Sequence, residues 1–350
     1  MILLSIYRRN KLWAISRLQE SNLIADLRTF KKGEKPGRVS WSTAWLTLIV
    51  FVFLLLPQVS WASGIAGNRY FPVTLAVDHP FVCDELSFIG NYIQESDQRT
   101  SEISVTYSKR ITPNLGIDLR DAYRILKSNG GKTENGFSNF EVGAKYQFLV
   151  NDQHETLLSI GIDTELGKTG NKSVGANSFS TISPKFFFGK GLGDLPEPAK
   201  YLRPLAVTGA IGPNFPTRSR NTTTNVDPDT GQMLKDIERN PATFTWGLTA
   251  QYSLQYLQTY VKDVGLGTPF NRMIFLAEFP LETSLNRGSA GRTTGFVNPG
   301  VVWCGEFIQL GIEVQVPINN QTRGHVGVLA IMNLFIDDIF PKSLGRPIFP

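Results

Sequence analysis

The sequence predicts an all-β protein, an up-and-down antiparallel transmembrane β-barrel of about twelve strands. Long segments alternate strictly between apolar and polar residues, the linkers between them alternate between long and short, and a secretory leader precedes them. The composition agrees with this fold class. Glycine (32 residues), phenylalanine (23) and tyrosine (10) are plentiful in a chain of 350 residues with only 19% charged residues.

Residues 1–62 form the predicted leader, which contains a secretory signal peptide. Basic residues within 31–38 precede an apolar run at 44–56, and Ser60 and Ala62 supply the small residues of a cleavage site. The apolar run is about 13 residues long, shorter than the ~20 that a membrane-spanning helix needs. We therefore expect export through a cleaved signal peptide, with an uncleaved N-terminal anchor as the alternative.

The alternation after the leader has a period of two residues, which is typical of strands with one apolar and one polar face. The segments 244–252 and 308–316 show it most clearly, with apolar residues at every even position. Such strands build either a soluble sandwich with the apolar faces inside or a membrane barrel with the apolar faces outside. The strand length of about 9–11 residues favours the barrel, because it matches a tilted membrane crossing. The soluble sandwich remains the alternative.

The predicted barrel occupies residues 86–340, between a periplasmic N-terminal segment at 63–85 and a C-terminal tail at 341–350. Its strands are expected at 86–94, 101–110, 115–124, 138–149, 155–166, 179–189, 203–212, 243–255, 271–282, 293–303, 307–317 and 324–336. Long outer loops then alternate with short periplasmic turns, and both termini lie on the periplasmic side. The linkers at 192–202 and 258–270 are long for periplasmic turns, so the strand count could differ by two.

Charged residues on the polar faces are the candidate pore-lining residues, because a basic residue on the lipid face would cost about 2–4 kcal/mol at the membrane midplane. These residues are Glu102, Arg110, Asp118, Arg120, Glu141, Lys145, Asp163, Glu165, Lys185 and Glu313. They could line a pore that selects solutes by charge and size. They could equally form a ladder of cross-strand ion pairs that fills a narrow lumen.

The distribution of charge excludes a nucleic-acid partner. Residues 1–62 hold nine Lys or Arg and three Asp or Glu, and the rest of the chain holds 26 basic and 27 acidic residues. The net charge of +5 thus belongs to the leader. Three scattered histidines and two cysteines show no metal-ligand spacing, and no nucleophile-elbow motif presents a serine. We therefore predict no metal, no cofactor and no catalytic residue.

The two cysteines could be joined by a disulfide. Cys83 precedes the first predicted strand and Cys304 lies in the turn after the tenth, so both are expected on the oxidising periplasmic side. Strand spacing places the two positions about 14–15 Å apart, so a bridge requires residues 79–85 to fold under the barrel mouth. Two unrelated free thiols are the favoured alternative, because connectivity cannot be deduced from sequence.

Three stretches carry a resemblance to a known group of proteins. They are residues 79–88 (HPFVCDELSF), 101–113 (SEISVTYSKRITP) and 333–341 (NLFIDDIFP). Over roughly residues 79–341 the chain resembles uncharacterised proteobacterial outer-membrane putative transporters, which are similar to the barrel family associated with the meta-pathway of phenol degradation. The resemblance implies an outer-membrane β-barrel that transports solutes. Those barrels commonly end on an aromatic residue, whereas this chain continues to Pro350.

From this sequence we expect a bacterial outer-membrane channel or transporter for small solutes, which the resemblance implies are hydrophobic or aromatic. Its expected partners are outer-membrane lipid, the solute and the outer-membrane assembly machinery. Two alternatives stay open, because a fold does not establish a function. One is an outer-membrane lipid-modifying enzyme, which would need a Ser/His pair facing the membrane. The other is a closed structural barrel without transport.

Overall fold

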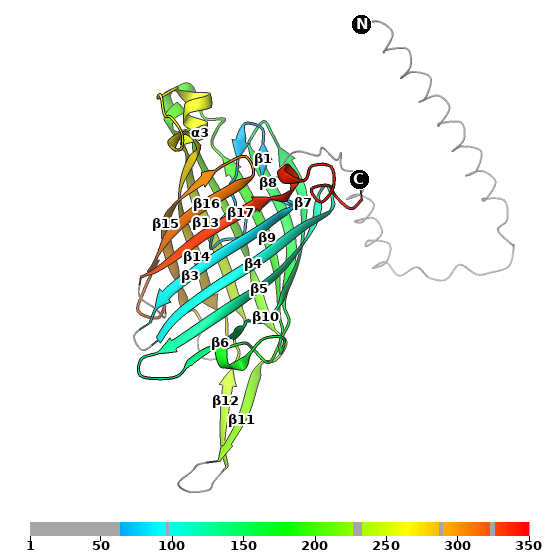
Figure 1. The fold of residues 1–350 in the computed structure, drawn as a ribbon, viewed down its shortest axis with the longest axis vertical. Helices are drawn as coiled ribbons and strands as arrows, with labels where there is room; N and C mark the ends of the chain where they lie inside the picture. The colour runs from blue at the N-terminus through cyan, green and yellow to red at the C-terminus, as the bar shows by residue number, and fades with distance from the viewer. Residues whose placement is uncertain (1–63, 96–97, 227–232, 287–289, 323–325, 350) are drawn as a thin grey trace, which may run out of the picture. The chain divides into compact units, whose positions relative to one another are not determined.

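The computed structural model describes residues 64–95, 98–226, 233–286, 290–322 and 326–349, so the predicted leader lies outside the described residues. Twelve antiparallel strands follow one another around a ring that closes where the last strand pairs with the first (Figure 1). The ring consists of β3 (Glu85–Gln94), β4 (Gln98–Thr112), β5 (Leu115–Ser128), β7 (Glu141–Asn151), β8 (Thr156–Glu165), β9 (Thr181–Gly191), β10 (Leu205–Pro216), β13 (Thr243–Ser253), β14 (Met273–Ser284), β15 (Thr293–Cys304), β16 (Ile308–Pro317) and β17 (Gly327–Phe335). The predicted up-and-down barrel is confirmed.

The distribution of side chains is the inverse of a soluble sandwich. In β16, Gln309 and Glu313 are 0% and 1% exposed, whereas Leu310 and Ile312 are 44% and 52% exposed. The other strands with strict alternation follow the same rule, with polar side chains inside the ring and apolar side chains outside. A surface of this kind is stable against hydrocarbon rather than water.

The two ends of the barrel differ. Tight turns join β4 to β5, β7 to β8 and β15 to β16 at one end, which we call the turn end. The opposite end, the loop end, carries β6 (Thr133–Phe137), which pairs with β5, and the hairpin of β11 (Arg220–Val226) and β12 (Met233–Arg239). Figure 1 shows this hairpin extending beyond the barrel. The alternation of long and short connections is the one expected from the sequence.

The two long linkers at the turn end contain helices instead of further strands. The linker between β9 and β10 forms η3 (Glu197–Leu202). The linker between β13 and β14 forms α3 (Leu254–Tyr256), η4 (Leu257–Val261) and η5 (Phe270–Arg272). The strand count is therefore twelve and not fourteen or ten. One further short helix, η2 (Lys172–Val174), lies at the loop end. Among the described residues, no helix is both long and apolar enough to span a membrane.

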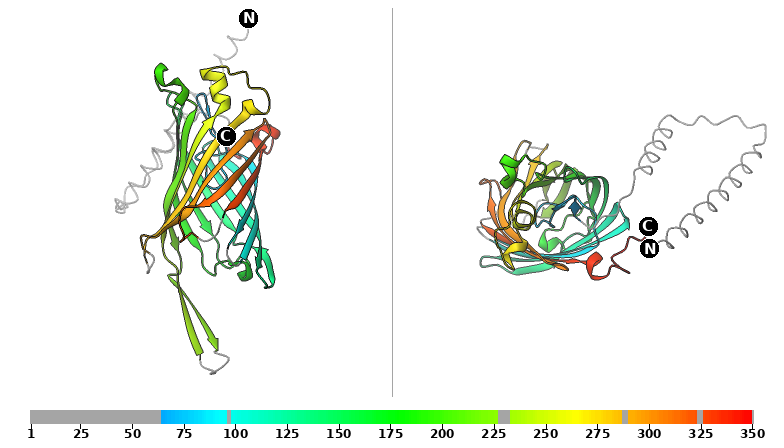
Figure 2. Two further views of the ribbon diagram at one scale, coloured as in Figure 1. Left: turned by 90° about the vertical axis from the view of Figure 1, so that its left-hand side faces the viewer. Right: turned by 90° about the horizontal axis from the view of Figure 1, so that it is seen from above.

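The segment at 64–84, which we call the lumen segment, enters the barrel. It begins at the turn end with the small hairpin of β1 (Ile65–Ala66) and β2 (Arg69–Tyr70), and then loops through the interior before β3 begins. Figure 2, seen from above, shows it in dark blue inside the ring of strands. The sequence placed this stretch in the periplasm. The structure places it in the lumen, because polar groups of the barrel wall bind its backbone.

The C-terminal residues leave the barrel earlier than predicted. The last strand ends at Phe335 and α4 (Ile336–Ile339) follows it, so the wall spans 85–335 rather than 86–340. The tail then reaches β4, the second strand along from β17, where the N–H groups of Ile348 and Phe349 donate to the carbonyls of Arg110 and Ile111 at 3.2 and 2.8 Å. This tail covers the turn end of β4.

Candidate functional site

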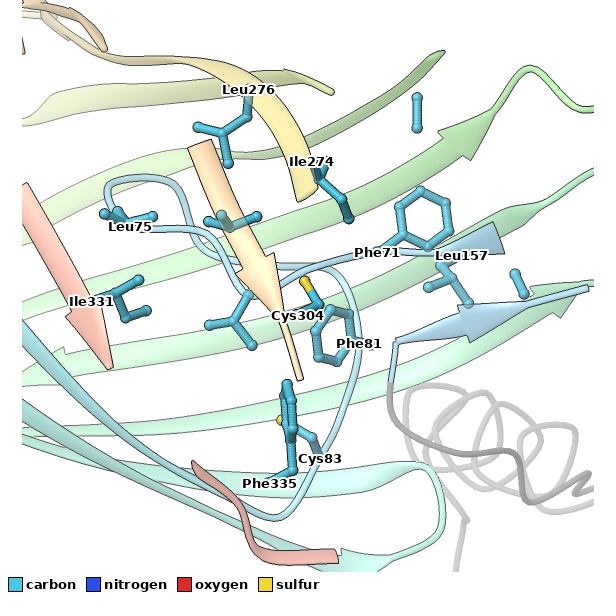
Figure 3. Packing of buried hydrophobic residues seen from close by; sticks show 14 of the residues in the cluster. Phe71, Leu75, Phe81, Cys83, Leu157, Ile274, Leu276, Cys304, Ile331 and Phe335 are labelled. Carbon is cyan, nitrogen blue, oxygen red and sulfur yellow. The ribbon is translucent and has the colours of Figure 1, made fainter. Parts of the chain in front are cut away.

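Apolar residues of the lumen segment pack against the inner face of the barrel. Phe71 (0% exposed) and Leu75 (6%) belong to a buried cluster that also contains Ile274, Leu276 and Val302 of the wall (Figure 3). Wall strands β14 and β15 are apolar on their inner face here, unlike most of the ring, because they face this segment rather than water. Burial of side chains of this size stabilises the segment by about 1.5–3 kcal/mol each.

A single carboxylate of the wall binds the deepest part of the lumen segment. Glu278 of β14 is fully buried and accepts hydrogen bonds from the backbone N–H groups of Leu75, Ala76 and Val77, at 2.8, 2.7 and 2.7 Å. These three N–H groups belong to no strand or helix, so the wall must supply their acceptor. A buried carboxyl group with three N–H donors has its hydrogen-bonding needs met by the lumen segment rather than by water.

Gln309 of β16 binds the neighbouring residue of the segment through both halves of its amide. Its Oε1 accepts from the N–H of Val73 at 3.1 Å, and its Nε2 donates to the carbonyl of Val73 at 2.7 Å. The side chain thus replaces the partner strand that Val73 lacks. Gln309 is fully buried, so loss of this contact would leave polar groups without partners.

Asp78 of the lumen segment lies between two basic residues of the opposite wall. Its carboxylate is 2.7 Å from Nζ of Lys185 on β9 and 3.2 Å from a guanidinium nitrogen of Arg120 on β5. Burial by itself would raise the pKa of Asp78, but Lys185 and Arg120 outweigh it and lower this pKa well below its usual range. Lys185 and Arg120 also bind Asp163 and Glu141 of the wall at 2.8 and 3.4 Å.

Both ends of the lumen segment, which we call its first and second arms, are fixed near the turn end. In the first arm, Arg69 is 1% exposed and its Nε lies 3.1 Å from Glu155, while its guanidinium carbon is 3.9 Å from the centre of the Tyr256 ring. In the second arm, the carboxylate of Asp84 binds Nε of Arg110 at 2.8 Å and Nζ of Lys109 at 2.9 Å. The segment is therefore a loop that is held at its tip and at both ends.

Between the lumen segment and the loop end lies a cavity of about 800 Å³. Residues 73–79 form its boundary on the segment side, and its lining reaches Glu282 and Thr322 at the loop end. Its walls are mostly polar, with Ser104, Thr106 and other hydroxyl and carboxyl groups of β3–β5. A chamber of this size accommodates a small solute.

Most of the predicted pore-lining residues meet in this cavity. Those on its wall are Glu102, Asp118, Arg120, Glu141, Lys145 and Asp163. Several are paired across strands, for example Glu102 with Arg124 at 2.6 Å, so the ion-pair ladder and the charged lining coexist. The remaining four lie elsewhere on the inner face. They are Arg110 beside Asp84, Glu165 beside Asn139, Lys185 beside Asp78 and Glu313 beside Asn298.

Cys83 and Cys304 are both buried and both free in the structure, which does not contain the possible disulfide between them. Cys83 belongs to the lumen segment, where burial raises the pKa of its thiol well above the usual value. Cys304 is the last residue of β15 and lies beside Gln309, 3.8 Å from Oε1.

Sequence reasoning missed the residues that bind the lumen segment. Glu278 stands alone in an otherwise apolar stretch, Met273–Leu281, and a single carboxylate in such a strand is a signal that it has a buried partner. Gln309 was assigned to the inner face, but uncharged residues were not counted as candidates. Arg69 and Asp78 lie in a segment without periodicity, where nothing in the sequence indicates the lumen.

The chain resembles known proteins in its fold. No family model and no curated protein match the chain. Among solved structures it is similar to the KdgM porin, with 13% identity and a TM-score of 0.39 over 71% of this chain and 98% of the porin. It is also similar to an outer membrane channel from Pseudomonas putida F1, with 9% identity and a TM-score of 0.46 over 76% and 99% of the two chains. LpxR from Salmonella typhimurium gives 10% identity and a TM-score of 0.36 over 72% and 99%.

Proposed function

We propose that the protein is a bacterial outer-membrane channel for small solutes, and that its lumen segment controls passage. The apolar outer surface of the ring supports insertion in a membrane, because charged and polar side chains face inward. The observation that carries the proposal is the polar cavity of about 800 Å³ whose inner boundary is residues 73–79 of the same chain. A solute that enters from the loop end meets the lumen segment before it can reach the turn end.

The cavity lining supports small hydrophilic solutes rather than the hydrophobic or aromatic ones that the sequence resemblance implied. Its acidic residues outnumber its basic ones. The acidic residues that face inward are Asp78, Glu85, Glu102, Asp118, Glu141, Asp163 and Glu282, and the basic ones are Arg120, Arg124 and Lys145, together with Lys185, which binds Asp78 and Asp163. Fixed negative charge in a narrow lumen attracts cations and repels anions. We therefore propose a preference for cationic or neutral polar solutes.

Planar-bilayer recording of the purified protein tests this function. Discrete conductance steps, with a reversal potential under a salt gradient that indicates cation preference, are the expected result. Asp118→Asn/Glu282→Gln should shift the reversal potential toward zero, because two carboxylates of the lining lose their charge. A channel that prefers anions, or one whose selectivity this double variant leaves unchanged, contradicts the proposed solute class.

A closed structural barrel is the second candidate, because the lumen segment is bound on several sides of the interior. It predicts no conductance, even after contacts of the segment are removed. No observation favours the lipid-modifying enzyme. His79 pairs with Glu85 and His154 with Asp194, so both of these histidines have carboxylate partners. His325 lies outside the described residues.

A further inference from the structure

Three residues of different chemistry meet where the lumen segment joins the wall. His79 and Cys83 belong to the segment, and Glu85 is the first residue of β3. A ring nitrogen of His79, the sulfur of Cys83 and a carboxylate oxygen of Glu85 all lie within 4.8 Å of one another. Cys83 and Glu85 are 3% and 2% exposed, so the group is almost entirely removed from bulk solvent.

The hydrogen bonding inside this group is incomplete. Nε2 of His79 lies 2.9 Å from Oε1 of Glu85, but Nδ1 of the same ring is buried without a hydrogen-bond partner. The thiol of Cys83 is not in a disulfide. A metal ion between Nε2, the Cys83 sulfur and Oε1 would take the place of the Nε2–Oε1 hydrogen bond, and Nδ1, on the other side of the ring, would then carry the N–H of the neutral imidazole. Imidazole, thiolate and carboxylate together form a ligand set that proteins use for zinc.

Neighbouring residues orient two of the three ligands. Nδ2 of Asn333 on β17 donates to Oε2 of Glu85 at 3.2 Å, which leaves Oε1 directed at the histidine. The His79 ring stacks on Phe81, with the ring centres 4.0 Å apart. Nζ of Lys145 donates to the backbone carbonyl of His79 at 3.0 Å, which fixes the chain at that point. The Asn333 contact is the kind of outer hydrogen bond that orients a metal ligand, whereas the ring of His79 is positioned by stacking.

We propose that His79, Cys83 and Glu85 bind a thiophilic divalent metal ion of the zinc class. Zinc bonds of about 2.0–2.3 Å require ligand atoms to lie within about 4 Å of one another, so the present spacing needs a small convergence. His79 and Cys83 can supply it, because they lie outside the strands. Calcium and magnesium do not fit, since they prefer oxygen ligands alone. His79 and Glu85 line the cavity, which gives the ion a route to the site.

The site would fasten the lumen segment to the barrel wall. Two ligands come from the segment and the third from β3, so the ion links the two directly. Metal ligation replaces the single hydrogen bond between His79 and Glu85. With three protein ligands, a fourth position stays open for water or a solute group, as in catalytic zinc sites. The inference does not depend on conductance, since metal binding is measured separately.

Titration with Co²⁺ as a spectroscopic substitute for Zn²⁺ tests the site in the full chain, purified in detergent. The expected result is one bound Co²⁺ per chain with a thiolate-to-cobalt absorption band that Zn²⁺ abolishes. Cys83→Ser should lose this band, and Cys304→Ser should keep it, because Cys304 is the matched buried thiol outside the site. Asn333→Ala should weaken binding about 10–100-fold through loss of support for Glu85.

A second measurement covers the case in which Cys83→Ser does not fold. In the Cys304→Ser protein the thiol of Cys83 is the single one; because this thiol is buried and its pKa is raised, its reaction with a small maleimide is followed over hours at alkaline pH, and Zn²⁺ should slow it at least tenfold. Absence of the cobalt–thiolate band in the wild-type protein would overturn the proposal. So would a labelling rate that Zn²⁺ leaves unchanged.

Discussion

At the scale of single residues, buried polar and charged side chains hold the lumen segment against the barrel wall. Glu278 faces three backbone N–H groups, Asp78 faces two cations, and Arg69 faces a carboxylate and an aromatic ring. None of these side-chain contacts belongs to the backbone pairing of strands that closes the ring. Their effect is to fix the lumen segment in one place.

Glu278→Gln tests the contact with the tip of the segment. A glutamine amide offers one acceptor oxygen in place of two, so the N–H groups of residues 75–77 lose part of their binding. We expect a loss of about 1.5–3 kcal/mol in the local stability of the segment. Faster hydrogen exchange at Leu75, Ala76 and Val77 measures it. Glu282→Gln, on the same face of β14, is the control and should leave these amides unchanged.

Arg69→Met tests the first arm. It leaves the Glu155 carboxylate buried without its cation, which typically costs about 3–5 kcal/mol. We expect residues 64–72 to become sensitive to a protease added from the turn-end side, while the barrel stays folded. Arg69→Lys should show a smaller effect, since it keeps the charge but loses the paired guanidinium contacts. Equal resistance of wild type and Arg69→Met would show that this anchor is dispensable.

At the scale of elements, the sequence predicts the strands well and the lumen segment poorly. The strand ends agree within four residues, because a period of two and the turn residues are local signals. The lumen segment has no such period. Its backbone finds partners in side chains more than 60 residues away, such as Gln147, Glu278 and Gln309, and only the folded barrel brings these together. The sequence likewise does not indicate that His79, Cys83 and Glu85 form a group, because only the fold of the lumen segment brings them together.

Glycines of the wall make room for the segment, and their substitution should expel it. A Cβ added to Gly247 of β13 would lie 2.8 Å from Cγ1 of Val77, and one added to Gly189 of β9 would lie 3.0 Å from Pro80. We expect Gly247→Leu to displace the segment and raise conductance without unfolding the barrel. Gly90→Leu is the matched control, because no atom lies within 4 Å of its Cβ position. Equal conductance of the two variants would count against a controlling role for the segment.

At the scale of the whole molecule, the ring presents an apolar belt to its surroundings and a polar interior. Ile312 lies in the middle of β16, points outward and is 52% exposed. We expect Ile312→Arg to destabilise the protein in lipid vesicles by about 2–4 kcal/mol, measured by urea unfolding from those vesicles. Ile318→Arg, just beyond the strand at the loop end, should cost about 0–1 kcal/mol. Equal costs at both positions would contradict the membrane placement.

The central claim is that the lumen segment controls passage through the barrel, and a reversible cross-link tests it most directly. A Cβ on Gly247 would lie 3.4 Å from Cβ of Val77, close to the spacing of about 3.5–4.5 Å that disulfides require. We expect Val77→Cys/Gly247→Cys to conduct poorly in planar bilayers when oxidised and to open in larger or more frequent steps after reduction. Val77→Cys alone should not respond to the reductant. If the double variant conducts equally well in both redox states, the lumen segment does not control the channel.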